Sequence, residues 1–166
     1  MDDKPLSLKA AAPLWIIALF ILAFAHYSGS ALGLILQRVS DQKEESILAV
    51  WKSADGNGKI QIYRRSGVYF GKIVFVKFEN QTGAQVLDLK NPDPLKHKNQ
   101  VLGIEILKSF SYSGDGVWNN GTIYDPKTGK TYSCKLTLES PNELKIRGYI
   151  GISLLGRTEI WKRSKL

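Results

Sequence analysis

The chain has 166 residues, and its 23 lysines and arginines against 15 aspartates and glutamates give a formal net charge of +8 at pH 7. This length predicts one domain, with room for an appendage, and it is sufficient for a core held together by packing alone. The single cysteine, Cys134, excludes an intramolecular disulfide.

The first predicted element is an apolar run over residues 14–36, which contains no formally charged residue. A secretory signal would use residues 14–25 as its apolar stretch and the small residues at 23–25 or 28–30 for cleavage. An uncleaved anchor would use the whole run, since roughly 20 residues cross a bilayer. We therefore expect residues 1–31 to be a signal peptide or a membrane anchor, and the short apolar stretch favours the signal. The rest of the chain is then exported, periplasmic or secreted, or else anchored in the inner membrane by residues 14–36.

The next segment, residues 32–46, predicts a polar linker or a short exposed helix, because most of its later residues are charged or polar. From residue 47 onward, apolar and polar residues alternate with a period of two, which is typical of half-buried strands. We therefore expect an all-β domain over residues 47–166. Its candidate strands are 47–52, 59–63, 68–78, 101–112, 116–124, 132–139, 143–150 and 155–162.

Turn residues such as the Asp-Gly-Asn-Gly of residues 55–58 separate these strands, and they predict an antiparallel meander. A meander with one apolar face must stack as two sheets or close into a barrel. Closure also removes exposed sheet edges. We predict an up-and-down barrel of about eight strands, preceded by an N-terminal hydrophobic helix. Gly148, Gly151 and Gly156 are expected where the last two strands bend to meet the first.

Residues 87–100 interrupt the alternation with two prolines and several basic residues. Asn91 could cap a short helix that opens at Pro92, with Asp93 favourable in the first turn. We expect a long loop or a single helical turn across one mouth of the barrel. Such loops are often functional, and Asn91, Pro92, Asp93 and His97 are therefore candidate residues of a lid.

Four segments together carry a family resemblance: AVWKSADGNGKIQIY, NPDP, GTIYDPKTGKTY and LKIRGYIGISLLGRTEIW. In order and spacing they resemble the bacterial family called domain of unknown function 2147, from about residue 47 to residue 163. The resemblance implies a small exported protein with a lipocalin-like (calycin) barrel, and it implies no established activity. Members often carry two cysteines around the second hairpin. This chain has none there, so its hairpin must rely on Tyr69, Phe70, Ile73 and Phe75.

Lipocalin-like barrels usually place Gly-x-Trp on the first strand and an arginine from the last strand over the indole. Here Ala49-Val50-Trp51 stands in that position, with alanine for glycine. The resemblance implies that Arg157 or Arg163 stacks on Trp51, where a cation–π contact would close one end of the barrel. The sequence does not separate the two arginines, because a shift of one residue in register changes the face that each occupies.

The residues favour no catalytic or metal chemistry. His26 and His97 are the two histidines, and no His/Cys cluster accompanies them, so we expect no metal and no cofactor. Cys134 alternates with apolar neighbours and is predicted to lie in the core. Asp88, Asp93 and Asp125 could converge near a mouth, but a type I turn accounts for the segment that begins at Asp125. No nucleophile–base pair can be named, so we expect no enzyme.

We expect a non-enzymatic exported or membrane-tethered barrel that binds a small apolar or amphipathic ligand, with an inward Arg147 or Arg157 pairing with an acidic head. The alternative is an envelope interaction module with a filled barrel that acts through its basic surface or the 87–100 loop. The basic charge suggests an anionic membrane surface or an envelope protein as a partner, and no nucleic acid, although a solvated outer face explains it more simply. The candidate ligand-binding residues are Trp51, Tyr63, Phe75, Trp118, Tyr124, Arg147, Arg157 and Trp161.

Overall fold

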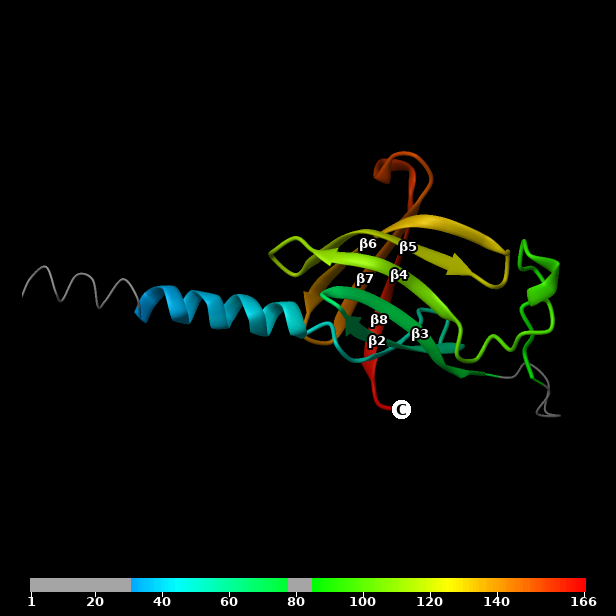
Figure 1. Ribbon diagram of the computed structural model, residues 1–166, viewed down its shortest axis with the longest axis horizontal. Coiled ribbons are helices and arrows are strands. Elements are labelled where there is room, and N and C mark those ends of the chain that lie inside the picture. Colours follow the sequence, from blue (N-terminus) through cyan, green and yellow to red (C-terminus); the bar gives the residue numbers. More distant parts are fainter. Residues whose placement is uncertain (1–30, 78–84) are drawn as a thin grey trace, which may run out of the picture. The chain divides into compact units, whose positions relative to one another are not determined.

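The computed structural model describes residues 31–77 and 85–166 (Figure 1). The chain divides into two units, Met1–Ser40 and Asp41–Leu166. Residues 31–45 form a helix, and its side chains are almost all exposed. No helix among the described residues is long and apolar enough to span a membrane. The predicted signal peptide or anchor lies, except for its last residue, outside the described residues.

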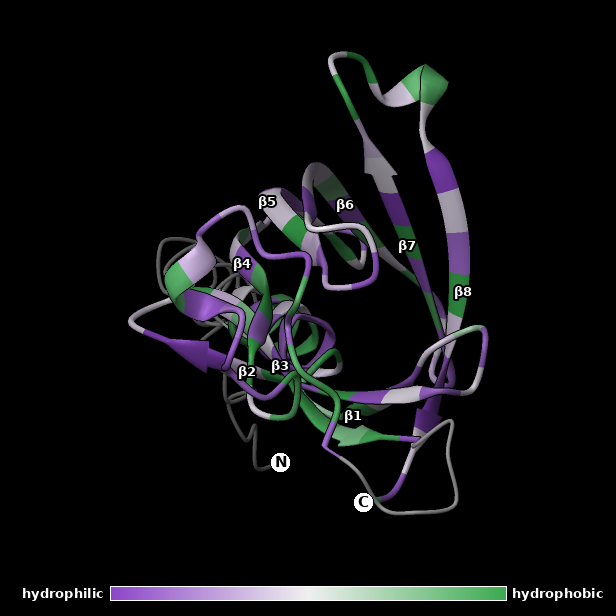
Figure 2. Ribbon diagram, turned by 90° about the vertical axis from the view of Figure 1, so that its right-hand side faces the viewer, coloured by the Kyte–Doolittle hydropathy of each residue, from purple (hydrophilic) through white to green (hydrophobic). Residues whose placement is uncertain are grey.

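The second unit contains a closed antiparallel barrel of eight strands in the order β1 to β8, so the predicted up-and-down barrel is confirmed (Figure 2). Each strand pairs with its neighbours in sequence, and β1 also pairs with β8. The strands are β1 (Val50–Lys52), β2 (Gly58–Arg65), β3 (Val68–Val76), β4 (Glu105–Tyr112), β5 (Val117–Asp125), β6 (Lys130–Ser140), β7 (Glu143–Tyr149) and β8 (Arg157–Ser164).

The two ends of the barrel differ in how they are filled. In an up-and-down barrel, alternate connections lie at opposite ends. We call the end with the β1–β2, β3–β4, β5–β6 and β7–β8 connections the mouth, and the other the closed end. Large side chains with no solvent exposure fill the closed end, and each contributes roughly 1.5–3 kcal/mol through burial. They include Trp51, Tyr69, Phe110, Trp118, Leu136 and Leu144.

A clasp between the last strand and the first seals the closed end. The guanidinium of Arg163 lies 4.6 Å from the centre of the Trp51 ring, and the two residues are partners in the β1–β8 register. Arg163 also donates from Nη2 to the Ser46 carbonyl (2.6 Å) and from Nε to the Pro141 carbonyl (2.5 Å). Burial lowers the pKa of Arg163. Of the two arginines that the sequence left open, the structure selects Arg163 for this position.

Replacing Arg163 by lysine tests the clasp. Lysine keeps the charge but loses the planar fork that stacks on Trp51 and donates to two carbonyls at once. We expect the free energy of unfolding to fall by about 2–3 kcal/mol, from lost charge-assisted hydrogen bonds and cation–π attraction. Urea unfolding followed by tryptophan fluorescence measures it. Arg157→Lys is the matched control, and an equal loss in both variants would contradict the assignment.

The three clustered glycines serve the β7–β8 connection, so the prediction that they bend the last strands toward the first is wrong. Gly148 pairs with Arg157 at the mouth end of this hairpin, whereas β8 meets β1 through Lys162, Arg163 and Ser164. A Cβ at Gly156 would lie 2.6 Å from the Gly148 carbonyl oxygen, so the chain crosses itself too closely for a side chain.

The glycines that allow inward packing lie elsewhere, at irregular points of the strand register. The register shifts between Trp118 and Gly121 in β5. A Cβ at Gly121 would lie 2.4 Å from ring atoms of Phe110, which has no solvent exposure. The ring of Phe110 thus lies directly against backbone, and the bulge provides the local bend that a small barrel needs.

We expect Gly121→Ala to destabilise the barrel by about 1–3 kcal/mol, the typical cost of overpacking a core. The loss should shrink when Phe110→Leu is added, because the smaller side chain leaves room for the new methyl group. A double-mutant cycle in urea measures the coupling. Strictly additive losses would show that Phe110 is not the obstacle.

Candidate functional site

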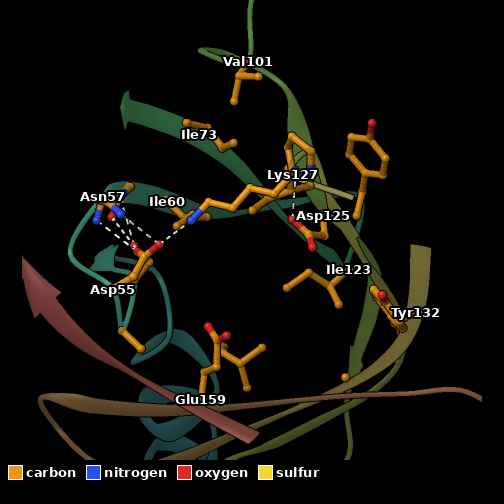
Figure 3. A pocket seen from close by; sticks show the side chains of 18 of the residues that line it. Asp55, Asn57, Ile60, Ile73, Val101, Ile123, Asp125, Lys127, Tyr132 and Glu159 are labelled. Carbon is orange, nitrogen blue, oxygen red and sulfur yellow. Dashed lines mark hydrogen bonds and ion pairs between the residues drawn. The ribbon is translucent and has the colours of Figure 1, made fainter. Parts of the chain in front are cut away.

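The mouth half of the barrel holds an open cavity of about 1260 Å³. Ligand cavities are usually about 300–1,000 Å³, so this one has room for a small organic molecule. Its deep wall is apolar and comes from inward positions on β2 to β5, β7 and β8. Figure 3 shows Ile60, Ile73 and Ile123 of this wall. The main contributors are Ile60, Ile73, Ile106, Ile123, Ile146 and Trp161.

The rim of the cavity is charged, and one ion pair connects two of its turns. Lys127 Nζ in the β5–β6 connection lies 2.7 Å from Asp55 Oδ2 in the β1–β2 connection (Figure 3). Ser53 Oγ and the Asn57 amide also donate to Asp55, at 2.6 and 3.0 Å. Burial alone would raise the pKa of Asp55, but the hydrogen bonds from Lys127, Ser53 and Asn57 outweigh it and hold the pKa well below its usual range.

A second polar group lies on the cavity wall contributed by β8. Arg157, Glu159 and Trp161 alternate along this strand and all line the cavity. Arg157 Nη2 lies 3.3 Å from Glu159 Oε1, and Trp161 Nε1 donates to Glu159 Oε2 at 3.4 Å. The side chain of Arg157 is 86% exposed. β8 therefore presents a cation, an acceptor and an aromatic surface in sequence from the rim inward.

A buried carboxylate fixes the segment that covers one side of the mouth. Asp88 is only 1% exposed, and it accepts hydrogen bonds from Tyr124 Oη (2.6 Å) and Asn91 Nδ2 (2.7 Å). Burial, together with the hydrogen bond to Asp88, raises the pKa of Tyr124 to about 12. Because Tyr124 belongs to β5, this bond ties to the barrel wall a segment whose residues 85–87, 89 and 90 line the cavity.

The predicted lid residues have a different local structure from the one expected. The short helix is the 3₁₀ turn Pro94–Lys96, and its cap is Asp93, whose carboxylate accepts from the Leu95 amide at 3.1 Å. Asn91 instead accepts from the Asp93 amide and forms a turn, so the predicted cap at Asn91 is wrong. His97 Nε2 lies 2.8 Å from the Asn91 carbonyl. None of Asn91, Pro92, Asp93 and His97 lines the cavity.

Three of the predicted ligand-binding residues line the cavity: Tyr124, Arg157 and Trp161. Trp51 and Trp118 are fully buried in the closed end instead. Trp51 stacks against the guanidinium of Arg163, and the ring centres of Trp118 and Tyr112 are 5.1 Å apart. Both therefore belong to the structural core.

The other three residues belong to strands of the barrel, but their side chains do not line the cavity. Tyr63 stacks on Phe70 and donates its hydroxyl to Glu105, and Phe75 is exposed beneath the ammonium group of Lys59. Arg147 does not face inward as predicted. Its guanidinium donates to carbonyls of the β7–β8 connection.

Sequence reasoning missed the aliphatic wall and Glu159. It named aromatic and basic residues as ligand contacts and named no inward isoleucine such as Ile60 or Ile146 among them. The signal for Glu159 was present, because a strand residue two positions before Trp161 shares its face.

Catalytic and metal chemistry find no support among the described residues. They contain no group of three or more His, Cys, Asp or Glu side chains that could hold a metal. Cys134 is buried in the core, as predicted, and burial raises its pKa to about 12, which disfavours a nucleophilic thiolate. Of the three aspartates considered, Asp88 holds Tyr124, Asp93 caps the 3₁₀ turn and Asp125 accepts from the Lys127 amide.

The family described as uncharacterized proteins conserved in bacteria (DUF2147) matches residues 49–163. The chain belongs to this family. Among solved structures, the barrel of this DUF2147 protein is similar to HP1028 from the human pathogen Helicobacter pylori, which is described as belonging to the lipocalin family. The TM-score is 0.63 at 18% identity, covering 72% of this chain and 83% of that chain. This likeness shows a lipocalin-like fold. No curated protein matches the chain.

We expect Tyr124→Phe to destabilise the protein by about 1–3 kcal/mol, because Asp88, which is buried, loses one of its hydrogen bonds. Amide exchange should also speed up at Asp88, whose N–H donates to the Asn99 carbonyl. Tyr132→Phe is the matched control, since its hydroxyl has no hydrogen-bond partner among residues 31–77 and 85–166. Unchanged exchange at Asp88 would show that Tyr124 does not hold the segment.

Proposed function

We propose that this DUF2147 protein is a non-enzymatic barrel that binds one small apolar or amphipathic ligand in the mouth half of its interior. The observation that carries the proposal is the cavity of about 1260 Å³, whose deep wall is apolar and whose rim is charged. Lipocalin-like barrels are generally binding folds. A cavity of this kind takes an apolar body inside and leaves a polar end at the rim.

The expected affinity for the ligand follows from the apolar surface that the cavity wall offers for burial. A ligand that buries roughly 300 Å² of apolar surface gains about 7.5 kcal/mol at about 25 cal/mol per Å². Lost rotational and translational freedom offsets part of this gain, and polar contacts at the rim restore part of it. A dissociation constant in the micromolar range, equivalent to roughly −8 kcal/mol, is therefore the expected scale.

Arg157 is the proposed partner for an acidic head. It lines the cavity, its side chain is 86% exposed, and its ion pair with Glu159 lies at the rim, where water weakens it. Arg147, the other candidate, donates three hydrogen bonds to the β7–β8 hairpin and is not free to turn inward.

The alternative, an envelope interaction module, required a filled barrel, which the cavity does not match. Export or membrane tethering remains part of the proposal and is supported by the uncharged run of residues 14–36. Mass spectrometry of the N-terminus of the protein from fractionated cells tests it. A mature chain that begins near residue 26 or 31 supports export after cleavage, and an intact chain in the membrane fraction supports tethering. An intact chain in the soluble cytoplasmic fraction would contradict both.

Trp161 provides the ligand-binding test, because its indole lines the cavity whereas Trp51 and Trp118 are buried in the closed end. We expect a brominated fatty acid to quench the tryptophan fluorescence of the purified protein saturably. Trp161→Phe should remove most of the quenching, and Trp118→Phe should retain it. Quenching that does not saturate, or that survives Trp161→Phe, would contradict the proposal.

A variant that fills the cavity provides a second, independent test of ligand binding. Ile123→Phe places extra volume into the wall and should weaken fatty-acid binding at least tenfold in calorimetry. Thr122→Phe is the matched control, because neighbouring strand residues face opposite sides of a sheet and Thr122 does not line the cavity. Equal affinities in the two variants would place the ligand elsewhere.

A further inference from the structure

The connection between β7 and β8 exposes several aliphatic side chains to solvent. Residues 150–156, which we call the hairpin tip, contain Ile150, Ile152, Leu154 and Leu155, with exposures of 72, 61, 81 and 79%. Figure 2 shows the tip reaching beyond the barrel wall with hydrophobic residues at its end. A cluster of this kind on a folded surface usually marks an interaction site.

The tip is held in one shape by Arg147. Its guanidinium donates to the carbonyls of Ser153 (2.7 Å) and Leu154 (2.9 Å) and to Thr158 Oγ1 (2.7 Å). The amide of Leu155 donates to the Ile152 carbonyl at 3.3 Å, and that of Gly156 to the Ser153 carbonyl at 3.2 Å. Three successive carbonyls are therefore satisfied within the hairpin. Backbone that leaves water for an apolar medium needs such internal partners.

The charge around the tip has one sign over a long stretch. Residues 146–158 include Arg147 and Arg157 and contain no acidic residue, and Lys145 before them pairs with Glu139. Glu159, the first acidic residue after them, pairs with Arg157 and lines the cavity. Each basic residue near an anionic membrane adds to the electrostatic attraction. The tip thus combines exposed aliphatic groups with nearby cations, and this combination favours binding at a lipid interface.

We propose that the hairpin tip inserts into the interfacial layer of an anionic lipid bilayer. A protein partner fits less well, because the tip projects outward and its exposed groups are aliphatic, whereas protein interfaces concentrate aromatic anchors. Tyr149 stands at the base of the tip, where an aromatic ring suits the headgroup level. Ile150 and Leu155 also line the cavity, so an inserted tip brings the mouth to the lipid surface. Insertion itself does not depend on any ligand.

The test uses a local probe, because the apolar run of residues 14–36 could itself attach the full chain to vesicles. An environment-sensitive NBD label is placed on Ile152→Cys, in a Cys134→Ala background. A second protein carries the same label on Asn142→Cys, in the β6–β7 connection of the closed end. Both are mixed with vesicles of phosphatidylcholine with 30% phosphatidylglycerol, with and without lipids that carry a doxyl quencher near the headgroup.

We expect the Ile152 label to shift to shorter wavelength and to be quenched by the doxyl lipid, and the Asn142 label to change little. Leu154→Ser with Leu155→Ser should reduce the quenching at Ile152 by more than half. Leu95→Ser, at a leucine that is 90% exposed in the 3₁₀ turn, should leave it unchanged. Arg157→Glu should weaken insertion in vesicles with phosphatidylglycerol and have a smaller effect in phosphatidylcholine alone.

Three outcomes would overturn the proposal. The Ile152 label could respond no more than the Asn142 label. The serine pair could leave the quenching intact. The Ile152 label could also be shielded in solution without lipid, with a doubled mass in light scattering, which would assign the tip to a second copy of the chain. The label reports lipid contact at residue 152 and not ligand binding, so a failure here is distinguishable from a failure of the fatty-acid test, which uses the unsubstituted tip.

Discussion

The pairing of the first strand with the last keeps the barrel closed, and this seam is short. β1 contributes only Val50–Lys52, so few backbone hydrogen bonds join it to β8. Arg163 reinforces the seam, because one guanidinium stacks on Trp51 and also holds the carbonyls of Ser46 and Pro141. These groups belong to the segment before β1, to β1 itself and to the β6–β7 connection. Without this closure the sheet would have no enclosed face and no cavity.

The closed barrel separates stability from binding along its axis. The closed end contains the large aromatic rings and the leucines with no exposure, and it supplies most of the packing. The mouth half uses isoleucines, which cover the wall but do not fill the centre. Apolar surface left facing an open cavity forgoes stability that a filled core would gain, and natural proteins accept such losses mainly at functional sites. The same sheet can therefore vary its cavity wall without loosening the clasp at its other end.

The strands could be predicted from the sequence, because a half-buried strand alternates apolar and polar residues with a period of two. The cavity could not, since inward positions alternate identically whether the space in front of them is filled or empty. Ile60 and Leu136 look alike in sequence, yet Ile60 lines the cavity and Leu136 packs the closed end. The outward orientation of Arg147 could have been predicted, because Arg147 and Lys145 are two positions apart on one strand and therefore lie on the same face. The role of Asp88 was not, because it depends on a contact with Tyr124 across 36 residues of chain.

The glycines of the last hairpin and the exposed aliphatic residues between them share one explanation. A tight connection of two or three residues would have joined β7 to β8 with less exposed apolar surface. The chain instead uses residues 150–156 and directs Arg147 into their backbone, and it keeps Gly156 without a side chain so that the segment can cross Gly148 closely. These features fix a shape that leaves Leu154 and Leu155 in water. Folding alone does not require that arrangement, and the proposed insertion into a lipid surface accounts for it. Because Ile150 and Leu155 belong both to the tip and to the cavity wall, the exposed aliphatic surface is continuous with the path into the barrel.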